Sequence, residues 1–363
     1  MGMFLRVNMF WQTCLPAMSG FSVPLIHSGM NAMKEITAVP KRITVTILLI
    51  VSIVTLMSAC SAKDVKPEQN VYIAWSNNQE SYSFISTLRT VEAAGAKPVV
   101  MEQAMSYDLH YDSNGELTEA EEDEHGILTS EAAKKVKINT WQNSNVEEIM
   151  KDVDCVIFPG GSDICPTLYY DEQDWHGIED DTDYSAERDV SDYILISYCL
   201  ENDIPVLAIC RGMQMLSIVS GADMIQDLGQ WYEGQGLRYS NDHRDAKKEN
   251  FAAHSVTVIS RDSHLYRITG RETLSKVPSW HHQAVGSTDN TRLAVTAQAE
   301  TDGRRVIEGV ERPDKTFCIG VQFHPEVAVR KNLEKEKDAE SYMDYDTALC
   351  LFKALIDAGH GKV

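Results

Sequence analysis

Cys210 stands at a position where an α/β protein can carry a nucleophile. An apolar run over residues 204–209 predicts a buried strand, and the amphipathic pattern from Arg211 to Gly221 predicts a helix. A cysteine at such a sharp turn is exposed at the sheet edge, and the following backbone N–H groups point toward an oxyanion formed there. The helix N-terminus also favours thiolate over thiol. Taken alone, the segment also permits a buried structural cysteine at a strand end.

A base and a carboxylate that suit Cys210 occur near the C-terminus. The apolar run 317–323 predicts a strand that delivers His324, and Glu326 follows two residues later, after a proline that ends the strand. An imidazole that takes the thiol proton and a carboxylate that orients the imidazole make a catalytic triad with the cysteine. A lone histidine after a strand is more often structural, but its combination with Cys210 favours the triad.

The elements that must position these residues alternate between strand-like and helix-like patterns. The clearest are predicted strands at 71–75, 98–101 and 153–158 and predicted helices at 82–94, 146–150 and 185–201. Such alternation predicts an α/β fold with a mostly parallel sheet. We expect one domain over residues 70–363.

Three motifs give the sequence a family resemblance. They are Pro-Gly-Gly at 159–161, Ile-Cys-Arg-Gly-Met-Gln at 209–214 and Gln-Phe-His-Pro-Glu at 322–326. Together they resemble the signatures of class I glutamine amidotransferase-like domains, over about residues 70–357. Ala208, Arg211 and the Trp-His-His-Gln-Ala run at 280–284 resemble, more narrowly, γ-glutamyl-γ-aminobutyrate hydrolases, a branch of the γ-glutamyl hydrolase-like cysteine peptidases. The resemblance implies a flavodoxin-like three-layer sandwich with a mostly parallel central sheet.

The resemblance also implies the reaction and its residues. Cys210 would attack a γ-glutamyl carbonyl to give a thioester, His324 would act as the base, and Glu326 would orient it. The backbone N–H groups of Gly161 and Arg211 would form the oxyanion hole.

Further residues are expected to bind the substrate, a small γ-glutamyl amide or peptide. The nominated positions are Gly160, Gln214, His282 and Gln283, and Arg188 and Asp189 also match a family pattern. The chemistry requires no cofactor. We expect no metal site, because no third ligand has a spacing that matches the paired histidines at 281 and 282.

Two other functions are compatible with this fold. One is a glutaminase subunit that passes ammonia to a synthetase, which would need an ATP-using partner. The other is a non-catalytic binding lipoprotein, because folds host sites rather than dictate them. The intact Cys210, His324 and Glu326 argue against the binding lipoprotein.

Acidic insertions interrupt the alternation at 105–140 and 171–183. Residues 110–121 partly resemble a calcium loop, but the first ligand position would be His110, a poor ligand for a hard cation. We therefore expect an exposed, charged insertion. Acidic insertions near the site entrance would favour a small or cationic leaving amine over a polyglutamate tail.

The N-terminal region has the pattern of a leader. Lys41 and Arg42 precede an uncharged run, 43–57, that is shorter than the ~20 residues of a membrane-spanning helix. Small residues before Cys60 then resemble a bacterial lipoprotein cleavage site, although Met57 stands where Leu is usual. We expect residues 1–59 to be a signal peptide and 60–69 a lipid-anchored tether. An uncleaved anchor is the alternative, and Met33 is a more natural start, which would make 1–32 an upstream extension.

Composition narrows the class of partners. With 43% hydrophobic and 24% charged residues the chain is globular. A net charge of −21 argues against nucleic acid and against a polybasic membrane surface. The eight cysteines form no C-x-x-C pair and no disulfide framework. We therefore expect no nucleic-acid partner and membrane contact only through the lipid, outside the cytoplasm; the sequence indicates no oligomeric state.

Overall fold

The computed structural model describes residues 69–176, 184–245, 247 and 250–361, all within one compact unit, Lys66–Val363. The strands are β1 (Asn70–Ile73), β2 (Lys97–Val100), β3 (Val156–Phe158), β4 (Val206–Ile209), β5 (Asp223–Ile225), β6 (Ala252–Val258), β7 (Thr273–Ser279), β8 (Ala284–Ser287), β9 (Ala294–Thr301), β10 (Arg304–Glu311) and β11 (Cys318–Val321). The α-helices are α2 (Tyr82–Ala93), α3 (Ser130–Asn139), α4 (Val146–Ile149), α5 (Ala186–Glu201), α6 (Arg211–Val219), α7 (Leu228–Gly234), α8 (His264–Thr269), α9 (Pro325–Leu333) and α10 (Tyr345–Gly359). Short 3₁₀ turns occur at Pro166–Leu168 and Ala339–Ser341.

Nine of the described strands form one sheet in the order β2-β1-β3-β4-β11-β10-β9-β6-β7. The first five pair in parallel. Counted along the chain, these five have the order 2-1-3-4-5 of flavodoxin-like folds, in which ligands bind outside the carboxyl ends of the strands. The α/β fold predicted from the alternating pattern is confirmed, and its parallel half is where a site is expected.

The other half of the sheet differs from the predicted mostly parallel arrangement. β10 pairs antiparallel with β11, and the strands β10, β9, β6 and β7 pair antiparallel with one another in turn. The turn between β9 and β10 is Asp302-Gly303, with φ of 48° and 75°. An Asp-Gly pair with positive φ at both positions favours a two-residue hairpin, which joins antiparallel strands. The sheet is therefore mixed.

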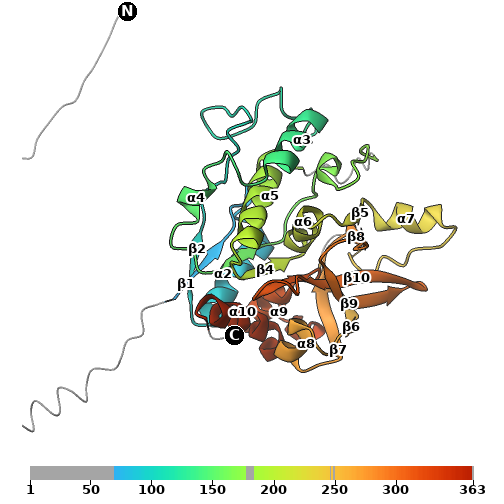
Figure 1. Cartoon of the computed structure of the whole chain (residues 1–363). Helices are drawn as coiled ribbons and strands as arrows, with labels where there is room; N and C mark the ends of the chain where they lie inside the picture. Colours follow the sequence, from blue (N-terminus) through green and yellow to red (C-terminus); the bar gives the residue numbers. More distant parts are fainter. Residues whose placement is uncertain (1–68, 177–183, 246, 248–249, 362–363) are drawn as a thin grey trace, which may run out of the picture. The chain divides into compact units, whose positions relative to one another are not determined.

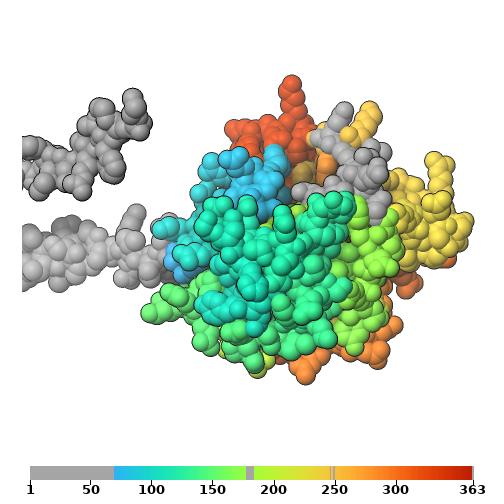
Figure 2. All heavy atoms as spheres, turned by 90° about the horizontal axis from the view of Figure 1, so that it is seen from above, coloured from blue at the N-terminus to red at the C-terminus, as the bar shows by residue number. Residues whose placement is uncertain are grey.

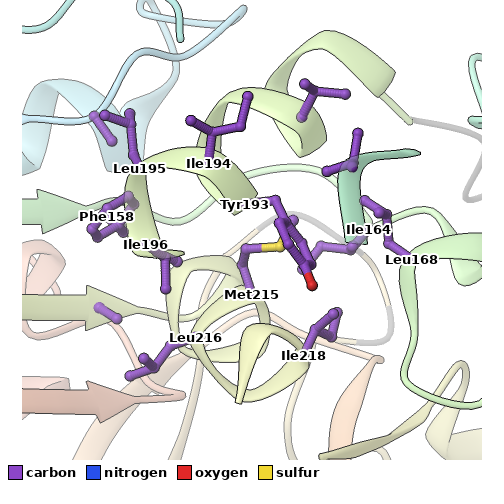
Figure 3. Close-up of a cluster of buried hydrophobic side chains, with 14 of the residues drawn as sticks. Phe158, Ile164, Leu168, Tyr193, Ile194, Leu195, Ile196, Met215, Leu216 and Ile218 are labelled. Carbon is purple, nitrogen blue, oxygen red and sulfur yellow. The ribbon is translucent and has the colours of Figure 1, made fainter. Parts of the chain in front are cut away.

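Side chains that alternate along the parallel strands face two different helical layers. In β3, Val156 and Phe158 pack in one core cluster with residues of α3, α5 and α6, whereas Ile157 packs in the other with residues of α2 and α10. Figure 1 places these two sets of helices on opposite sides of the sheet. Figure 3 shows Phe158 in the first cluster, near side chains of α5 and α6 such as Ile196 and Met215. The result is a three-layer sandwich.

The insertion at 105–140 is more deeply anchored than the sequence predicts. Asp112 and Asp123 are exposed, as expected, and residues drawn in cyan and green cover much of the face in Figure 2. However, Leu117, Leu128 and Val136 are buried in the first core cluster, and helix α3 lies within the segment. The few apolar residues are spaced widely among charged ones, so that their periodicity is weak in the sequence.

Hydrogen bonds within the chain account for the calcium-like pattern in this insertion. The Asp112 carboxylate accepts hydrogen bonds from the backbone N–H groups of Asn114 and Glu116, at 2.7 and 3.0 Å. Glu121 is buried, and its carboxylate lies 2.8 Å from Nδ1 of His110. The acidic residues thus serve a turn and an internal pair.

The predicted leader, Cys60 and the rest of the tether up to residue 68 lie outside the described residues, as does part of the second acidic insertion, 177–183. In the part of the chain that the structure describes, no helix is long and apolar enough to cross a membrane.

Candidate active site

Cys210 occupies a strained turn between β4 and α6. Its φ of 51° lies in the left-handed region, which costs about 1–3 kcal/mol for a residue with a side chain. The Cys210 backbone N–H donates to the carbonyl of Val321 at 2.7 Å, which ties the turn to β11. A Cβ on Gly212 would lie 2.3 Å from the carbonyl oxygen of Phe158, so only glycine lets α6 begin this close to β3. The local sequence therefore builds a nucleophile elbow.

His324 and Glu326 form a buried pair at the end of the neighbouring strand β11. Pro325 is the first residue of α9, a favourable place for proline, and it turns the chain directly after His324. Nδ1 of His324 lies 2.6 Å from Oε1 of Glu326, and the His324 backbone N–H donates to the carbonyl of Pro278 at 2.8 Å. The imidazole is thus fixed from its side chain and its backbone.

Charge favours the protonated form of His324. Burial alone would lower the pKa of this imidazole, but the Cys210 sulfur and the Glu326 carboxylate both stabilise the cation and raise the pKa to about 10. An imidazolium beside a thiolate is the resting state of an activated cysteine. The Gln322 side chain also donates from Nε2 to Sγ of Cys210 at 3.5 Å.

Ser83, in the first turn of α2, is a site residue that the sequence analysis missed. Its hydroxyl donates to Oε1 of Glu326 at 2.7 Å and lies 3.4 Å from Nδ1 of His324. Ser81 caps the same helix by accepting from the backbone N–H of Phe84. The Ser-Tyr-Ser pattern after β1 is visible in the sequence, but only the fold brings Ser83 beside His324 and Glu326, which are 241 and 243 residues away in the chain.

The loop after β3 places Gly160 and Gly161 beside the triad. A Cβ on Gly160 would lie 2.7 Å from Cε1 of His324, and one on Gly161 would overlap the guanidinium of Arg188. Nη2 of Arg188 donates to the carbonyls of Pro159 and Gly160, at 3.0 and 2.9 Å. Arg188 thus engages both carbonyls of this loop and lines the cavity itself. Gly161 lines the cavity and Gly160 does not.

A buried ionic network supports the second predicted oxyanion donor, Arg211. Arg211 is the first residue of α6, where backbone N–H groups have no acceptor within the helix. Its guanidinium makes short hydrogen bonds to Asp189 and Asp192 of α5. Burial raises the pKa of Asp189 to about 6, although Arg211 opposes the shift. The network holds α5 and the elbow together.

A cavity of about 770 Å³ joins these parts. Residues that follow the carboxyl ends of β1, β3, β4 and β11 line it, as the switch-point rule predicts for this strand order. Trp280 and Phe251 add an aromatic wall, and their rings lie 5.5 Å apart. None of the lining residues comes from 105–140 or from the described part of 171–183. The described residues therefore give no support to the expected influence of the acidic insertions on the leaving amine.

The structure gives the nominated substrate residues distinct surroundings. Nε2 of Gln214 donates to the carbonyl of Gln283 and to Oε1 of Gln322, so this amide braces the wall of the cavity. His282 lies between two carboxylates, with Nε2 2.9 Å from Asp163 and Nδ1 3.0 Å from Asp227. All three nominated side chains, of Gln214, His282 and Gln283, line the cavity.

A second cluster of polar side chains lies behind this wall. His243, His254, His281 and Glu308 each point one ligand atom at a common centre, with those atoms within 4.8 Å of one another. The sequence analysis excluded a metal site because no third ligand had the right spacing. The four side chains of this cluster come from separate segments, so no short sequence spacing could reveal them.

The fold and the site define a class: α/β proteins with a cysteine at a strand-to-helix elbow, a buried histidine–carboxylate pair and N–H groups suited to an oxyanion. The profile of the peptidase C26 family matches residues 129–326, more than half of the chain. The chain belongs to the peptidase C26 family.

The relatives carry related names. A glutamine amidotransferase-like protein of Rickettsia prowazekii is 28% identical over 251 residues, which cover 60% of this chain and 81% of the relative. The γ-glutamyl-γ-aminobutyrate hydrolase PuuD of Escherichia coli K12 is 28% identical over 184 residues, 50% of this chain and 68% of the relative. A solved glutamine amidotransferase from Thermotoga maritima is 15% identical, covers 81% of this chain and 97% of its own, and has a TM-score of 0.42.

Proposed function

We propose that this protein hydrolyses γ-glutamyl amides through a thioester on Cys210. The observation that carries the proposal is a strained cysteine that shares one cavity with His324, whose imidazole is paired with the buried Glu326. The likeness to a named γ-glutamyl-γ-aminobutyrate hydrolase supports the choice of substrate class.

In the first half-reaction, the Cys210 thiolate attacks the γ-carbonyl carbon and a C–S bond forms. The negative charge moves to the carbonyl oxygen, where the backbone N–H groups of Gly161 and Arg211 stabilise it; one such donor is typically worth about 3 kcal/mol of barrier. The C–N bond then breaks, and His324 gives its proton to the departing amine. A γ-glutamyl thioester and a free amine result.

In the second half-reaction, His324 is neutral and takes a proton from water. The water oxygen attacks the thioester carbonyl, the C–S bond breaks, and glutamate leaves. The thiolate and the imidazolium are restored, so one water is consumed for each amide bond cut. Glu326 orients the imidazole in both halves and stabilises its charge.

The glutamyl head requires an acceptor for its ammonium group, and Asp163 is suited to that role. Its carboxylate lines the cavity and is fixed by His282, which Asp227 holds in turn. Gln283 lines the same wall, and its buried Nε2 has no hydrogen-bond partner among the described residues. We assign the ammonium to Asp163 and the α-carboxylate to this Gln283 amide.

Replacing Asp163 by asparagine removes the charge and keeps the shape. Hydrogen bonds to charged groups are worth about 1.5–3 kcal/mol, so we expect KM to rise roughly 10- to 100-fold while kcat changes less. Steady-state kinetics on one γ-glutamyl amide measures both constants. Asp154→Asn, at an exposed position, is the matched control. An unchanged KM in Asp163→Asn would remove this residue from the substrate site.

The experiment that tests the function is amine release from a panel of γ-glutamyl amides. The panel contains γ-glutamyl-γ-aminobutyrate, γ-glutamyl peptides, a folyl-polyglutamate and glutamine, and the enzyme is the full-length chain in mild detergent. We expect turnover that is lost in Cys210→Ala and kept in Cys350→Ala, since Cys350 lies on α10 and donates to Thr347 outside the cavity.

Each outcome of the panel has a definite meaning. Turnover restricted to glutamine would indicate a glutaminase subunit. A folded protein with no turnover on any member would overturn the proposal in favour of a binding protein. Turnover that persists in Cys210→Ala would refute the nucleophile.

We also propose that the protein is held at the outer face of a bacterial membrane by lipid on Cys60. The support is the sequence pattern alone: a basic segment, a short apolar run and small residues before the cysteine.

A further inference from the structure

The cluster of His243, His254, His281 and Glu308 comes from four separate segments. His254 lies on β6 and Glu308 on β10, whereas His281 follows β7 and His243 precedes β6. Glu308 and His243 are fully buried, and only 9% of the His254 side chain is exposed. Burial of a carboxylate with three imidazoles is costly unless a cation is shared among them.

The outer contacts of the histidines fix which ring nitrogens face inward. Nδ1 of His281 lies 2.9 Å from the carbonyl of Gln283, and Nδ1 of His254 lies 3.4 Å from the carbonyl of Ser255. Carbonyl oxygens only accept, so these outer nitrogens carry the protons and the inner ones hold lone pairs in the neutral rings. Nε2 of His243, also an outer atom, lies 3.0 Å from the Thr301 hydroxyl. Such outer-shell partners are typical of metal-binding histidines.

The inner atoms approach one another without making hydrogen bonds. Oε1 of Glu308 lies 3.0 Å from Nδ1 of His243, 3.8 Å from Nε2 of His254 and 3.5 Å from Nε2 of His281. These three nitrogens and both Glu308 oxygens are buried without a hydrogen-bond partner among the described residues. At His254 and His281, lone pairs that face a carboxylate at these distances require a positive charge between them. Nδ1 of His243 can instead carry a proton, because the Thr301 hydroxyl can donate to Nε2.

The spacing suits a small divalent ion. With metal–ligand bonds of about 2.0–2.1 Å, the ligand atoms of a tetrahedral zinc site lie about 3.3–3.4 Å apart. The three distances from Glu308 bracket this value. Three imidazoles and one carboxylate are ligands that zinc accepts. Among first-row divalent metals, affinity for such a site rises from cobalt to nickel to copper and is lower again for zinc.

We propose that His243, His254, His281 and Glu308 bind one transition-metal ion, with zinc as the favoured ion. Four protein ligands fill a tetrahedral shell, so the ion is structural. It lies outside the triad, and the proposal does not depend on the proposed function.

The ion would brace the wall of the cavity. The ligand His281 stands between Trp280, whose carbonyl lies 3.9 Å from Sγ of Cys210, and His282, which holds Asp163. The His281 backbone N–H donates to the carbonyl of His243 at 3.0 Å, so two ligands are already linked through the main chain. Binding would fix the 280–283 segment against β6 and β10.

The test is the metal content of the full-length protein, purified without a polyhistidine tag and without chelators. Elemental analysis is expected to find about one zinc per chain in the wild type. Glu308→Gln and His254→Gln should lose it, because each removes one of the four ligands while keeping a similar volume. His264→Gln, a histidine on α8 outside the cluster, should retain it.

A second measurement does not depend on the variants folding. Removal of metal from the wild type with a chelator should lower Tm by several degrees, and added Zn²⁺ should restore it. Added Co²⁺ should give the absorption bands of a tetrahedral site.

Two results would contradict the site. If the folded wild type retains no metal and its Tm does not respond to Zn²⁺, Co²⁺, Ni²⁺ or Cu²⁺, then protons rather than a metal ion balance the charge of Glu308. Equal metal in Glu308→Gln, His254→Gln and His264→Gln would place the ion elsewhere. Either result overturns the proposal.

Discussion

At the scale of single residues, the site depends on the electrostatic interactions of the His324 imidazole with the Cys210 sulfur and the Glu326 carboxylate. The Cys210 sulfur and the Glu326 carboxylate flank His324, and Ser83 donates to the same Glu326 oxygen that the imidazole approaches. The raised pKa of His324 favours the imidazolium at neutral pH, which suits the proposed transfer of its proton to the leaving amine. The charge of Glu326 is the part of this arrangement that a single substitution removes most cleanly.

Glu326→Gln is expected to move the alkaline limit of activity. The pKa of His324 is raised, so the cation is favoured at low pH and is lost only as pH rises through the folded-state value of about 10. Without the carboxylate this pKa falls, and the alkaline limb of kcat/KM should shift to lower pH by about one unit or more, with a lower kcat. A pH–rate profile measures the shift. Glu334→Gln, at the exposed C-cap of the same helix, should keep the wild-type limb. An unshifted limb in Glu326→Gln would contradict the assignment.

At the scale of elements, the site is assembled from the carboxyl ends of parallel strands and the helices that follow them. Registers such as Ala208 opposite Gly320 and Ile209 opposite Val321 bring the ends of β4 and β11 level. The nucleophile and the base are therefore adjacent although 114 positions separate them in the sequence. Helix α5 contributes Arg188, which lines the cavity and holds the glycine loop through the carbonyls of Pro159 and Gly160.

Arg188→Lys tests this positioning role. Lysine keeps the charge next to Asp192 but cannot hold two carbonyls with one planar group, so the loop of Gly160 and Gly161 should loosen. We expect kcat to fall about 10- to 100-fold with little change in KM, since the oxyanion donor acts in the transition state. Steady-state kinetics together with a measurement of Tm checks this. Arg267→Lys on α8 is the control. If a lower Tm fully accounts for the lower kcat, Arg188 only stabilises the fold.

At the scale of the whole molecule, a mixed sheet carries two functional regions. The parallel half bears the proposed triad, and the antiparallel strands β6, β7 and β10 carry or flank the ligands of the proposed metal site. The loop after β7 touches both, because it contains Trp280, His281 and His282. The proposed attachment to a membrane depends on the leader and Cys60.

Cys60→Ala is expected to release the protein from the membrane. A lipid on the cysteine would carry the wild type into the detergent-rich phase when a detergent solution is separated into two phases. Mass spectrometry should also detect the attached lipid. The variant should incorporate none. Cys14→Ala, within the leader, should behave as wild type. Equal lipid incorporation by wild type and Cys60→Ala would contradict the anchor.

Features that depend on neighbouring residues could be predicted from the sequence. The elbow at Cys210, the proline turn after His324 and the alternation that defines the α/β fold are local patterns, and each could be predicted without a partner segment. The parallel half of the sheet followed from the same alternation. The antiparallel half was missed, although Asp302-Gly303 was a usable hairpin signal.

Contacts between side chains that are far apart in the chain depend on the packing of the whole fold and could not be predicted from the sequence. Ser83 beside Glu326, Arg188 beneath the glycine loop and the cluster around Glu308 each join segments far apart in the chain, and no short spacing encodes such meetings. The sequence analysis nominated Gln214 for substrate binding. In the structure its amide instead donates hydrogen bonds to Gln283 and Gln322, which are also far away in the chain. Local patterns fix the backbone conformation, whereas the packing of helices against a sheet fixes which polar groups share a buried space and must satisfy one another there.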